Sequence, residues 1–174
     1  VTDRMVDDVT AALAELGLQV AVTPQKSETT RFGDWRNSLA PMCVIAVCRM
    51  PPLKGQILMS VPAGLVSRLT DIFFGGDGEH ASERIAFTPT EQRIFLRLAD
   101  LLADAHSRAW PGPATPEVAA IETVRNNLRM AREGDPTIIQ SLTLQRGKIN
   151  LGRIDFVHAA PQLRGMFGAE DVGD

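Results

Sequence analysis

A helix that ends at a pair of glycines is the feature that most constrains the fold of this chain. Leu65, Leu69 and Ile72 are spaced as i, i+4 and i+7, so they form one apolar face of a helix. The pair Gly75-Gly76 is typical of a helix that ends in a left-handed backbone conformation. We therefore predict a helix over residues 62–74 that packs one face on a core.

A second helix start follows closely. Thr88 is a candidate N-cap, Pro89 takes the first helical position, and Glu91 completes a capping box. The segment between the helices begins with three glycines around an acidic residue, namely Gly75, Gly76, Asp77 and Gly78. One glycine suffices to cap a helix, so we interpret the other two as part of an exposed tip whose backbone another molecule approaches closely. The alternative, a plain helix cap and turn, stays open.

The remaining elements follow from apolar periodicity and turn residues. Helices are predicted over residues 2–16, 89–108 and 161–167, and strands over residues 18–23, 43–49, 56–61, 137–144 and 148–157. The segment 24–41 is either an irregular strand or a loop. The segment 118–130 fits a strand or a helix by its periodicity.

The two halves of the chain repeat one order of elements. Each half has a helix, two strands, a Gly-x-Ile strand, a proline and a leucine-bearing helix, with Gly55 and Ile57 in the first half and Gly152 and Ile154 in the second. We predict one α+β domain over residues 1–168, with halves 1–78 and 84–168 related by a pseudo-two-fold axis and a polar tail at 169–174. Tight turns between the strands indicate a mostly antiparallel sheet with the long helices packed on it.

Composition and charge exclude several classes of function. Lysine plus arginine number 18 against 21 for aspartate plus glutamate, a formal charge of -3, and the basic residues form no stripe, so nucleic acid is not an expected partner. No apolar run approaches the ~20 residues of a membrane helix, so we expect a soluble cytoplasmic chain without membrane insertion. The start without methionine and the polar end suggest a piece excised from a longer protein.

The sequence offers no visible catalytic or metal site. The three histidines lie far apart without ligand spacing, and no nucleophile elbow is present. Cys43 and Cys48, five positions apart on a strand, should lie on opposite faces as buried thiols rather than a disulfide. A phosphate loop at Gly75 to Gly78 is disfavoured, because the turn follows a helix and carries an acidic residue. We therefore expect no catalysis, no cofactor and no metal.

The central motifs resemble the middle domain of the flagellar motor switch protein FliM. The resemblance rests on the run from Leu65 to Gly78 with Phe73-Phe74 before the glycines, on Arg84-x2-Phe87-Thr88-x2-Glu91, and on a long helix that ends at Trp110. It is strong over residues 43–110 and weaker after residue 115. The family is similar in fold to the CheC and CheX phosphatases, a duplicated α/β unit, which agrees with the repeat.

The resemblance implies a structural role without chemistry, at the cytoplasmic face of the flagellar basal body. It implies that the turn of Gly75, Gly76, Asp77 and Gly78 docks on FliG. It also implies side-by-side self-association in a ring through the first helix, for which the charged residues Asp3, Arg4, Asp7 and Asp8 are candidates. FliN and phosphorylated CheY are implied as partners of the full-length protein.

Two alternatives come from other classes. A CheC-like phosphatase carries an Asp/Ser-x3-Glu-x2-Asn pattern on its helices, and the nearest imitation here, Asp100-x3-Asp104-x2-Ser107, has the wrong acid and no amide. The first helix has no asparagine at all. We therefore expect no phosphatase activity. The other alternative is a generic duplicated α+β interaction module without a role in a motor.

Overall fold

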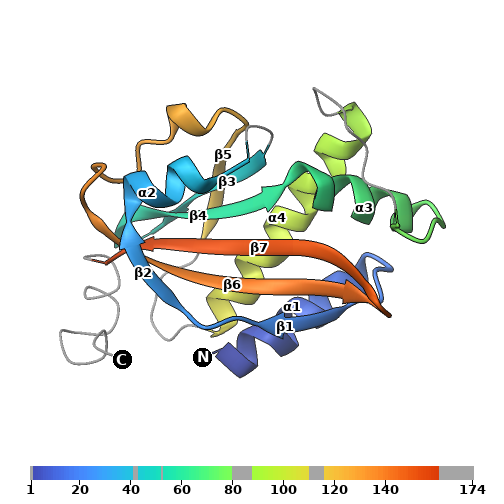
Figure 1. Cartoon of the computed structure of the whole chain (residues 1–174). Coiled ribbons are helices and arrows are strands. Elements are labelled where there is room, and N and C mark those ends of the chain that lie inside the picture. The colour runs from blue at the N-terminus through green and yellow to red at the C-terminus, as the bar shows by residue number, and fades with distance from the viewer. Residues whose placement is uncertain (1, 41–42, 52, 80–87, 110–115, 161–174) are drawn as a thin grey trace.

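The computed structural model describes residues 2–40, 43–51, 53–79, 88–109 and 116–160. The helices are α1 (Thr2–Glu15), α2 (Phe32–Ser38), α3 (Ala63–Phe73) and α4 (Pro89–Ala109), with a short 3-10 helix η1 (Arg125–Asn127). The strands are β1 (Ala21–Pro24), β2 (Glu28–Arg31), β3 (Cys43–Met50), β4 (Leu53–Pro62), β5 (Glu117–Glu122), β6 (Pro136–Arg146) and β7 (Ile149–Ala159). Figure 1 shows them arranged around one sheet.

The strands form a seven-stranded sheet in the order β1-β6-β7-β4-β3-β5, with β2 also paired to β6. Every described pairing is antiparallel. The fold is therefore α+β, as the tight turns between strands predicted. The run Cys43–Met50 lies between β4 and β5 and is buried along most of its length, which is the covered position expected for a nearly continuous apolar strand.

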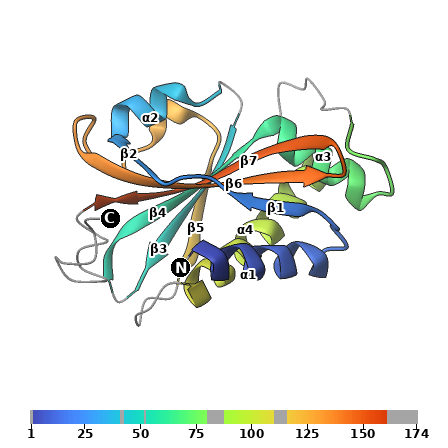
Figure 2. The same ribbon diagram turned by 60° about the horizontal axis from the view of Figure 1, so that its bottom comes forward.

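Helices cover both faces of the sheet. Figure 2 shows α1 and α4 on one side and α2 on the other. The larger core cluster joins apolar residues of α1, α3 and α4 to one face of the sheet, and a smaller cluster with Phe32 and Trp35 of α2 fills the opposite face. Cys48 belongs to the first cluster and Cys43 to the second, which confirms that the two thiols point to opposite faces.

The repeat predicted from the sequence has a counterpart at the centre of the sheet. Gly55 and Gly152 both adopt a positive φ, of 121° and 141°. Met59 follows Gly55 by the same number of positions as Phe156 follows Gly152, and Met59 pairs directly with Phe156 between β4 and β7. A two-fold axis at this pair exchanges β4 with β7 and β3 with β6, as the strand order requires. The boundaries of the two halves stay a prediction.

The predicted start of α4 agrees with the structure, whereas the predicted start of the first strand differs. The Glu91 backbone N–H donates to Thr88 Oγ1 at 3.1 Å, which confirms the predicted N-cap. Strand β1 begins at Ala21 rather than at residue 18. The undecided segment 24–41 contains β2 and the helix α2, and the segment 118–130 continues strand β5 into η1. The predicted helix 161–167, the tail 169–174 and the motif residues Arg84, Phe87 and Trp110 lie outside the described residues.

Candidate protein-docking site after helix α3

The end of α3 presents two aromatic side chains to solvent. Leu65, Leu69 and Ile72 bury one face of the helix, which leaves the following turn at the surface. Phe73 and Phe74 are 46% and 67% exposed, and their rings meet edge to face with centroids 5.4 Å apart. Large apolar side chains with this exposure, next to each other and held by a mutual contact, are typical of a protein-binding surface rather than of a core.

The backbone of the turn closes the helix in a regular way. The Phe74 N–H donates to the Thr70 carbonyl at 3.1 Å, and the Gly75 N–H donates to the Ile72 carbonyl at 3.0 Å. Gly75 itself has a φ of +94°, the left-handed conformation that the glycine pair predicted. The helix therefore ends where the sequence indicated, and Gly75 is its cap.

Asp71 organises the residues beyond the cap. Its carbonyl accepts the Gly76 N–H at 2.8 Å, and its carboxylate Oδ2 accepts the Gly78 N–H at 2.9 Å. A Cβ atom on Gly76 would lie 2.3 Å from that same Oδ2. A side chain at position 76 would therefore force the Asp71 carboxylate to move from this position.

Two arginines hold the carbonyl groups of the turn. Arg68 Nη1 donates to the carbonyl oxygens of Gly78 and Glu79, at 2.7 Å each. Arg146, which closes strand β6, donates from Nη1 to the Gly76 carbonyl at 2.9 Å. The turn is therefore fixed both to its own helix and to a distant hairpin, and it is a preformed surface.

Packing also restricts which residue can occupy position 78. Its φ is +76°, and a Cβ atom there would lie 2.8 Å from Ile72 Cδ1 and 3.2 Å from Leu151 Cδ2. Contacts or backbone conformation within the domain thus explain why each of the three positions is a glycine. Gly75 has a positive φ, Gly76 lies against the Asp71 carboxylate, and Gly78 has both a positive φ and close neighbours. The inference that these glycines exceed what the fold requires is therefore wrong, whereas the docking role of the turn stays a prediction. The exposure of the turn must be argued from its side chains instead.

The exposed side chains of the turn are those of Phe73, Phe74, Asp77 and Glu79, and Asp71 is exposed as well although its carboxylate is bonded within the turn. Asp77 Oδ1 accepts the Glu79 N–H at 2.9 Å, which fixes the carboxylate at the apex. The amides of Gly76 and Gly78 both donate to Asp71, so they are not directed at an anion, which agrees with the exclusion of a phosphate loop. Sequence reasoning noted the two phenylalanines only as neighbours of the glycines. Their position outside the apolar stripe of α3 was the signal that could have identified them.

The other candidate residues lie on α1. Asp3, Arg4 and Asp7 are exposed, whereas Asp8 is half-buried. Asp8 Oδ1 lies 3.9 Å from Arg108 Nε on α4, and its Oδ2 lies 4.0 Å from Arg4 Nε. Asp8 is therefore engaged within the molecule, while the other three face solvent. In Figures 1 and 2, the first half of α1 and the turn after α3 occupy different parts of the surface.

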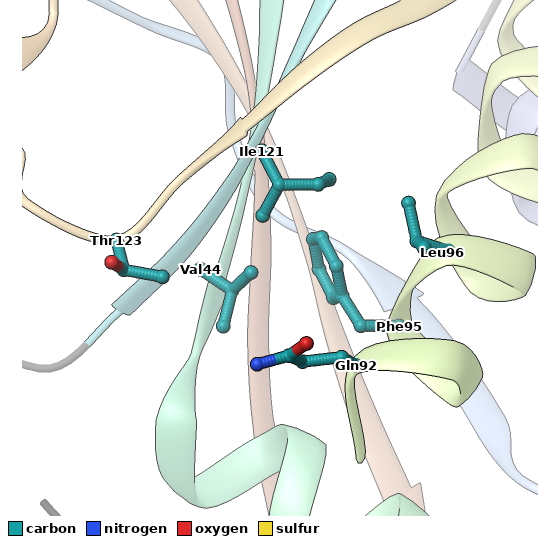
Figure 3. Close-up of a pocket in the computed structure, with 6 residues that line it drawn as sticks. All are labelled: Val44, Gln92, Phe95, Leu96, Ile121 and Thr123. Carbon is teal, nitrogen blue, oxygen red and sulfur yellow. The ribbon is translucent and has the colours of Figure 1, made fainter. Parts of the chain in front are cut away.

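A small apolar pocket lies between α4 and the edge of the sheet (Figure 3). It has a volume of about 270 Å³, and Phe95 and Leu96 of α4 face Val44 and Ile121 of β3 and β5 across it. Leu96 and Ile121 are 45% and 36% exposed at its mouth. Among the described residues that line it, the polar ones are Gln92 and Thr123, an amide and a hydroxyl, and none of these lining residues is titratable.

The core contains a histidine pair that the sequence did not reveal. His106 of α4 and His158 of β7 are both buried, with their Nε2 atoms 3.4 Å apart and their rings stacked at 5.0 Å. Burial lowers the pKa of His158 to about 4 and, together with the charge of His158, lowers the pKa of His106 well below its usual value. Both rings are neutral near pH 7. His80 lies outside the described residues.

No metal or thiol chemistry emerges from the described part of the chain. Within it, no three histidine, cysteine, aspartate or glutamate residues gather as a metal site would require. Burial raises the pKa of both cysteines, that of Cys48 to about 12, so neither is a thiolate at neutral pH. Asp100 and Asp104 are exposed on α4, as a solvated helix face predicts. Of the helices described, none is long and apolar enough to cross a membrane.

Known structures share the fold over nearly the whole chain. The FliM middle domain from Vibrio alginolyticus superposes with a TM-score of 0.83 at 21% identity, over 95% of this chain and 94% of that one. FliM in a FliG-FliM complex from H. pylori gives 0.75 at 15% identity, over 95% and 90%. A CheX-CheY complex from Borrelia burgdorferi gives 0.55 at 11% identity, over 90% and 95%. Fold and site together define a duplicated α+β domain of the CheX and FliM type with a rigid exposed turn.

The chain belongs to the FliM family, because the family described as "Flagellar motor switch protein FliM" matches residues 1–164. FliM of Pseudomonas aeruginosa is 43% identical over 84 residues, which cover 48% of this chain and 26% of that protein. FliM of Caulobacter vibrioides is 26% identical over 140 residues, covering 78% of this chain and 37% of that protein. The chain thus spans well under half the length of these relatives.

Proposed function

We propose that this domain is a non-enzymatic part of the flagellar motor switch that docks on FliG through the turn after α3. Membership of the FliM family and the existence of a FliG-FliM complex from H. pylori support this proposal. The observation that carries it is the exposed pair Phe73 and Phe74 on a turn fixed by Asp71, Arg68 and Arg146. A preformed contact loses little conformational entropy on binding.

Within the docking site, the glycines and the side chains have separate tasks. Gly75, Gly76 and Gly78 let the backbone take its shape, and the contact itself is made by the aromatic pair and by Asp77. Exposed aromatic residues supply most of the energy in many protein interfaces, where truncation of a central one costs about 2 kcal/mol or more. Phe74, the more exposed of the two, is the expected centre of the contact.

A titration with the middle domain of FliG tests this assignment. We expect Phe74→Ala to weaken binding by about tenfold or more, which corresponds to ~1.4 kcal/mol. Leu96→Ala is the matched control, because Leu96 is also an exposed apolar side chain but lies in the pocket of Figure 3. An equal effect of both variants, or unchanged binding by Phe74→Ala, would contradict the assignment. Variants at Gly76 or Gly78 are unsuited as the primary test, because they also disturb the internal contacts of the turn.

We further propose that copies of the domain pack side by side in a ring, with Asp3, Arg4 and Asp7 of α1 at the contact. Asp8 affects this contact indirectly, because its ion pair with Arg108 links α1 to α4. Reversal of charge by Asp3→Lys with Asp7→Lys should lower self-association measured by sedimentation velocity at low salt. Glu28→Lys with Asp34→Lys makes the same change of charge on β2 and α2. Self-association that responds equally to both pairs would speak against the α1 contact.

In the full-length protein, FliN and phosphorylated CheY are the further proposed partners, at the cytoplasmic face of the basal body, and the ring transmits the CheY-dependent change of rotation sense. Catalysis is not part of the proposal. A CheC-like phosphatase is disfavoured because Glu91 Oε1 accepts a hydrogen bond from the Thr88 hydroxyl at the start of α4, as part of the helix cap. Acceleration of phospho-CheY decay by the purified domain would overturn this view.

A further inference from the structure

A second concave surface lies on the face of the sheet opposite the long helices. It is formed by α2 and by the segment that contains η1, which lie side by side in both views (Figures 1 and 2). The pocket has a volume of about 450 Å³ and is lined by three arginines, Arg36, Arg129 and Arg132. Asn126, Leu128 and Glu133 also line it. It shares no lining residue with the docking turn or with the pocket of Figure 3.

The walls of this arginine pocket are joined by the backbone. The Gly33 N–H donates to the Glu133 carbonyl and the Phe32 N–H donates to the Asp135 carbonyl, each at 2.9 Å. A Cβ atom on Gly33 would lie 3.1 Å from the Glu133 carbonyl oxygen, so the two segments meet as closely as a glycine allows. The two segments that line the pocket are therefore held together by backbone contacts of the fold itself.

Arg36 is the most constrained of the three cations. Its side chain is only 12% exposed, it bonds Glu133 Oε1 at 2.5 Å, and its guanidinium lies over the Phe32 ring at 5.8 Å. Glu133 balances this charge. Arg36 is therefore held in place at one side of the pocket. Because Glu133 pairs with it, Arg36 does not by itself give the pocket a positive charge.

In the described part of the chain, no salt bridge is found for the side chains of the two other arginines, although Asp135 Oδ2 accepts the Arg132 backbone N–H at 3.0 Å. Arg129 Nη1 donates to the carbonyl groups of Asn126 and Leu128, and carbonyl oxygens orient a guanidinium without neutralising it. Glu133 is the one carboxylate among the described lining residues, and it is paired with Arg36. The pocket thus carries a local positive charge in a chain whose formal charge is -3.

The shape and the lining narrow the class of ligand. A single phosphate ion is best held by donors that converge on one point, whereas this pocket of about 450 Å³ is larger than one such ion and is lined by apolar as well as basic residues. A nucleic acid needs a longer basic track, and the chain has no basic stripe. We propose that the arginine pocket binds an acidic peptide segment of a partner protein, with carboxylates on Arg129 and Arg132 and an apolar side chain against Ala131, which is partly exposed.

Fluorescence anisotropy tests the proposal with a fluorescein-labelled peptide of alternating glutamate and leucine. We expect saturable binding that weakens as salt rises from 50 to about 300 mM, because salt screens exposed charges. Arg129→Glu with Arg132→Glu should weaken binding at least tenfold. Arg93→Glu with Arg97→Glu, the same change of charge on the exposed face of α4, should weaken it less than twofold. A matching glutamine-leucine peptide should not bind.

Several results would overturn the proposal. They are the absence of saturable binding, equal losses in the two pairs of variants, or binding of the glutamine peptide. Displacement of the peptide by inorganic phosphate at a similar concentration would identify a plain anion site instead. Amide chemical shift changes on titration provide a second readout, because they should gather at Asn126 to Glu133 and at Arg36 rather than at the turn after α3.

Discussion

The buried histidine pair predicts that this domain loses stability on mild acidification. His106 and His158 stack in the core, between α4 and β7, and burial holds the pKa of His158 at about 4 in the folded state. An unfolded histidine titrates near 6.5. Below pH 6.5 the unfolded chain therefore binds a proton that the folded chain does not, so the free energy of unfolding falls as the pH drops from about 6.5 towards 4.

The size of the effect follows from the two pKa values. A folded pKa of about 4 and an unfolded value of 6.5 predict a loss of about 2 kcal/mol between pH 7.5 and pH 5, and about 3 kcal/mol at pH 4. His106 acts in the same direction, since burial and the neighbouring ring also lower its pKa. A loss of 2 kcal/mol is large against the 5 to 15 kcal/mol stability that is typical of a domain.

Urea unfolding at pH 7.5 and pH 5, followed by tryptophan fluorescence, to which the buried Trp35 contributes, measures this loss. His158→Gln removes one titrating group, so its pH dependence over this range should be smaller by about 2 kcal/mol than that of the unaltered domain. If the variant folds poorly, NMR titration of the imidazole resonances in the unaltered domain is the alternative measurement. A pKa above 6 for His106 or His158, or an equal pH dependence in the variant, would refute the reasoning.

Three further predictions concern single contacts, each read as the urea midpoint at constant m-value. Gly76→Ala should destabilise the domain by about 1 kcal/mol or more because of the clash with Asp71, and clearly less when Asp71→Ala is already present, as contacting residues are not additive. Thr88→Ala should cost about 1 kcal/mol, because it removes the N-cap bond to α4. Asp155→Ala should cost about 2 kcal/mol or more, because this buried carboxylate accepts the Ser141 hydroxyl at 2.7 Å.

Most of the fold could be predicted because its elements have strong local signals. The stripe of α1, the apolar run of β3 and the capping box at Thr88 each depend on residues within one or two turns of chain. Helix α2 was missed because it has only seven residues, too few for periodicity to separate a helix from a loop. Its position depends on contacts with the distant β6 and η1 segments, which no local pattern contains.

The histidine pair and the arginine pocket could not be predicted from the sequence, for the same reason in both cases. His106 and His158 meet only because α4 packs on the face of the sheet that contains β7. Arg36 and Arg129 line one pocket only because α2 and the segment around η1 lie side by side on the other face. In a chain with scattered charges, spacing along the sequence gives no indication of either neighbour.

The turn after α3 illustrates a different kind of error, in which its glycines were explained as surplus although each has a reason within the fold. The number of glycines in a turn does not tell whether the space beside the backbone is open to a partner or is occupied by side chains of the same domain. Here Asp71 fills the space at Gly76, and Arg146 reaches the turn from strand β6. Loss of FliG binding in a glycine variant would therefore fit both a damaged contact and a damaged turn. Phe73, Phe74 and Asp77 are exposed and can be changed without removing a glycine or the Asp71 and Arg146 bonds that hold the turn, so the role of the turn has to be tested at these side chains.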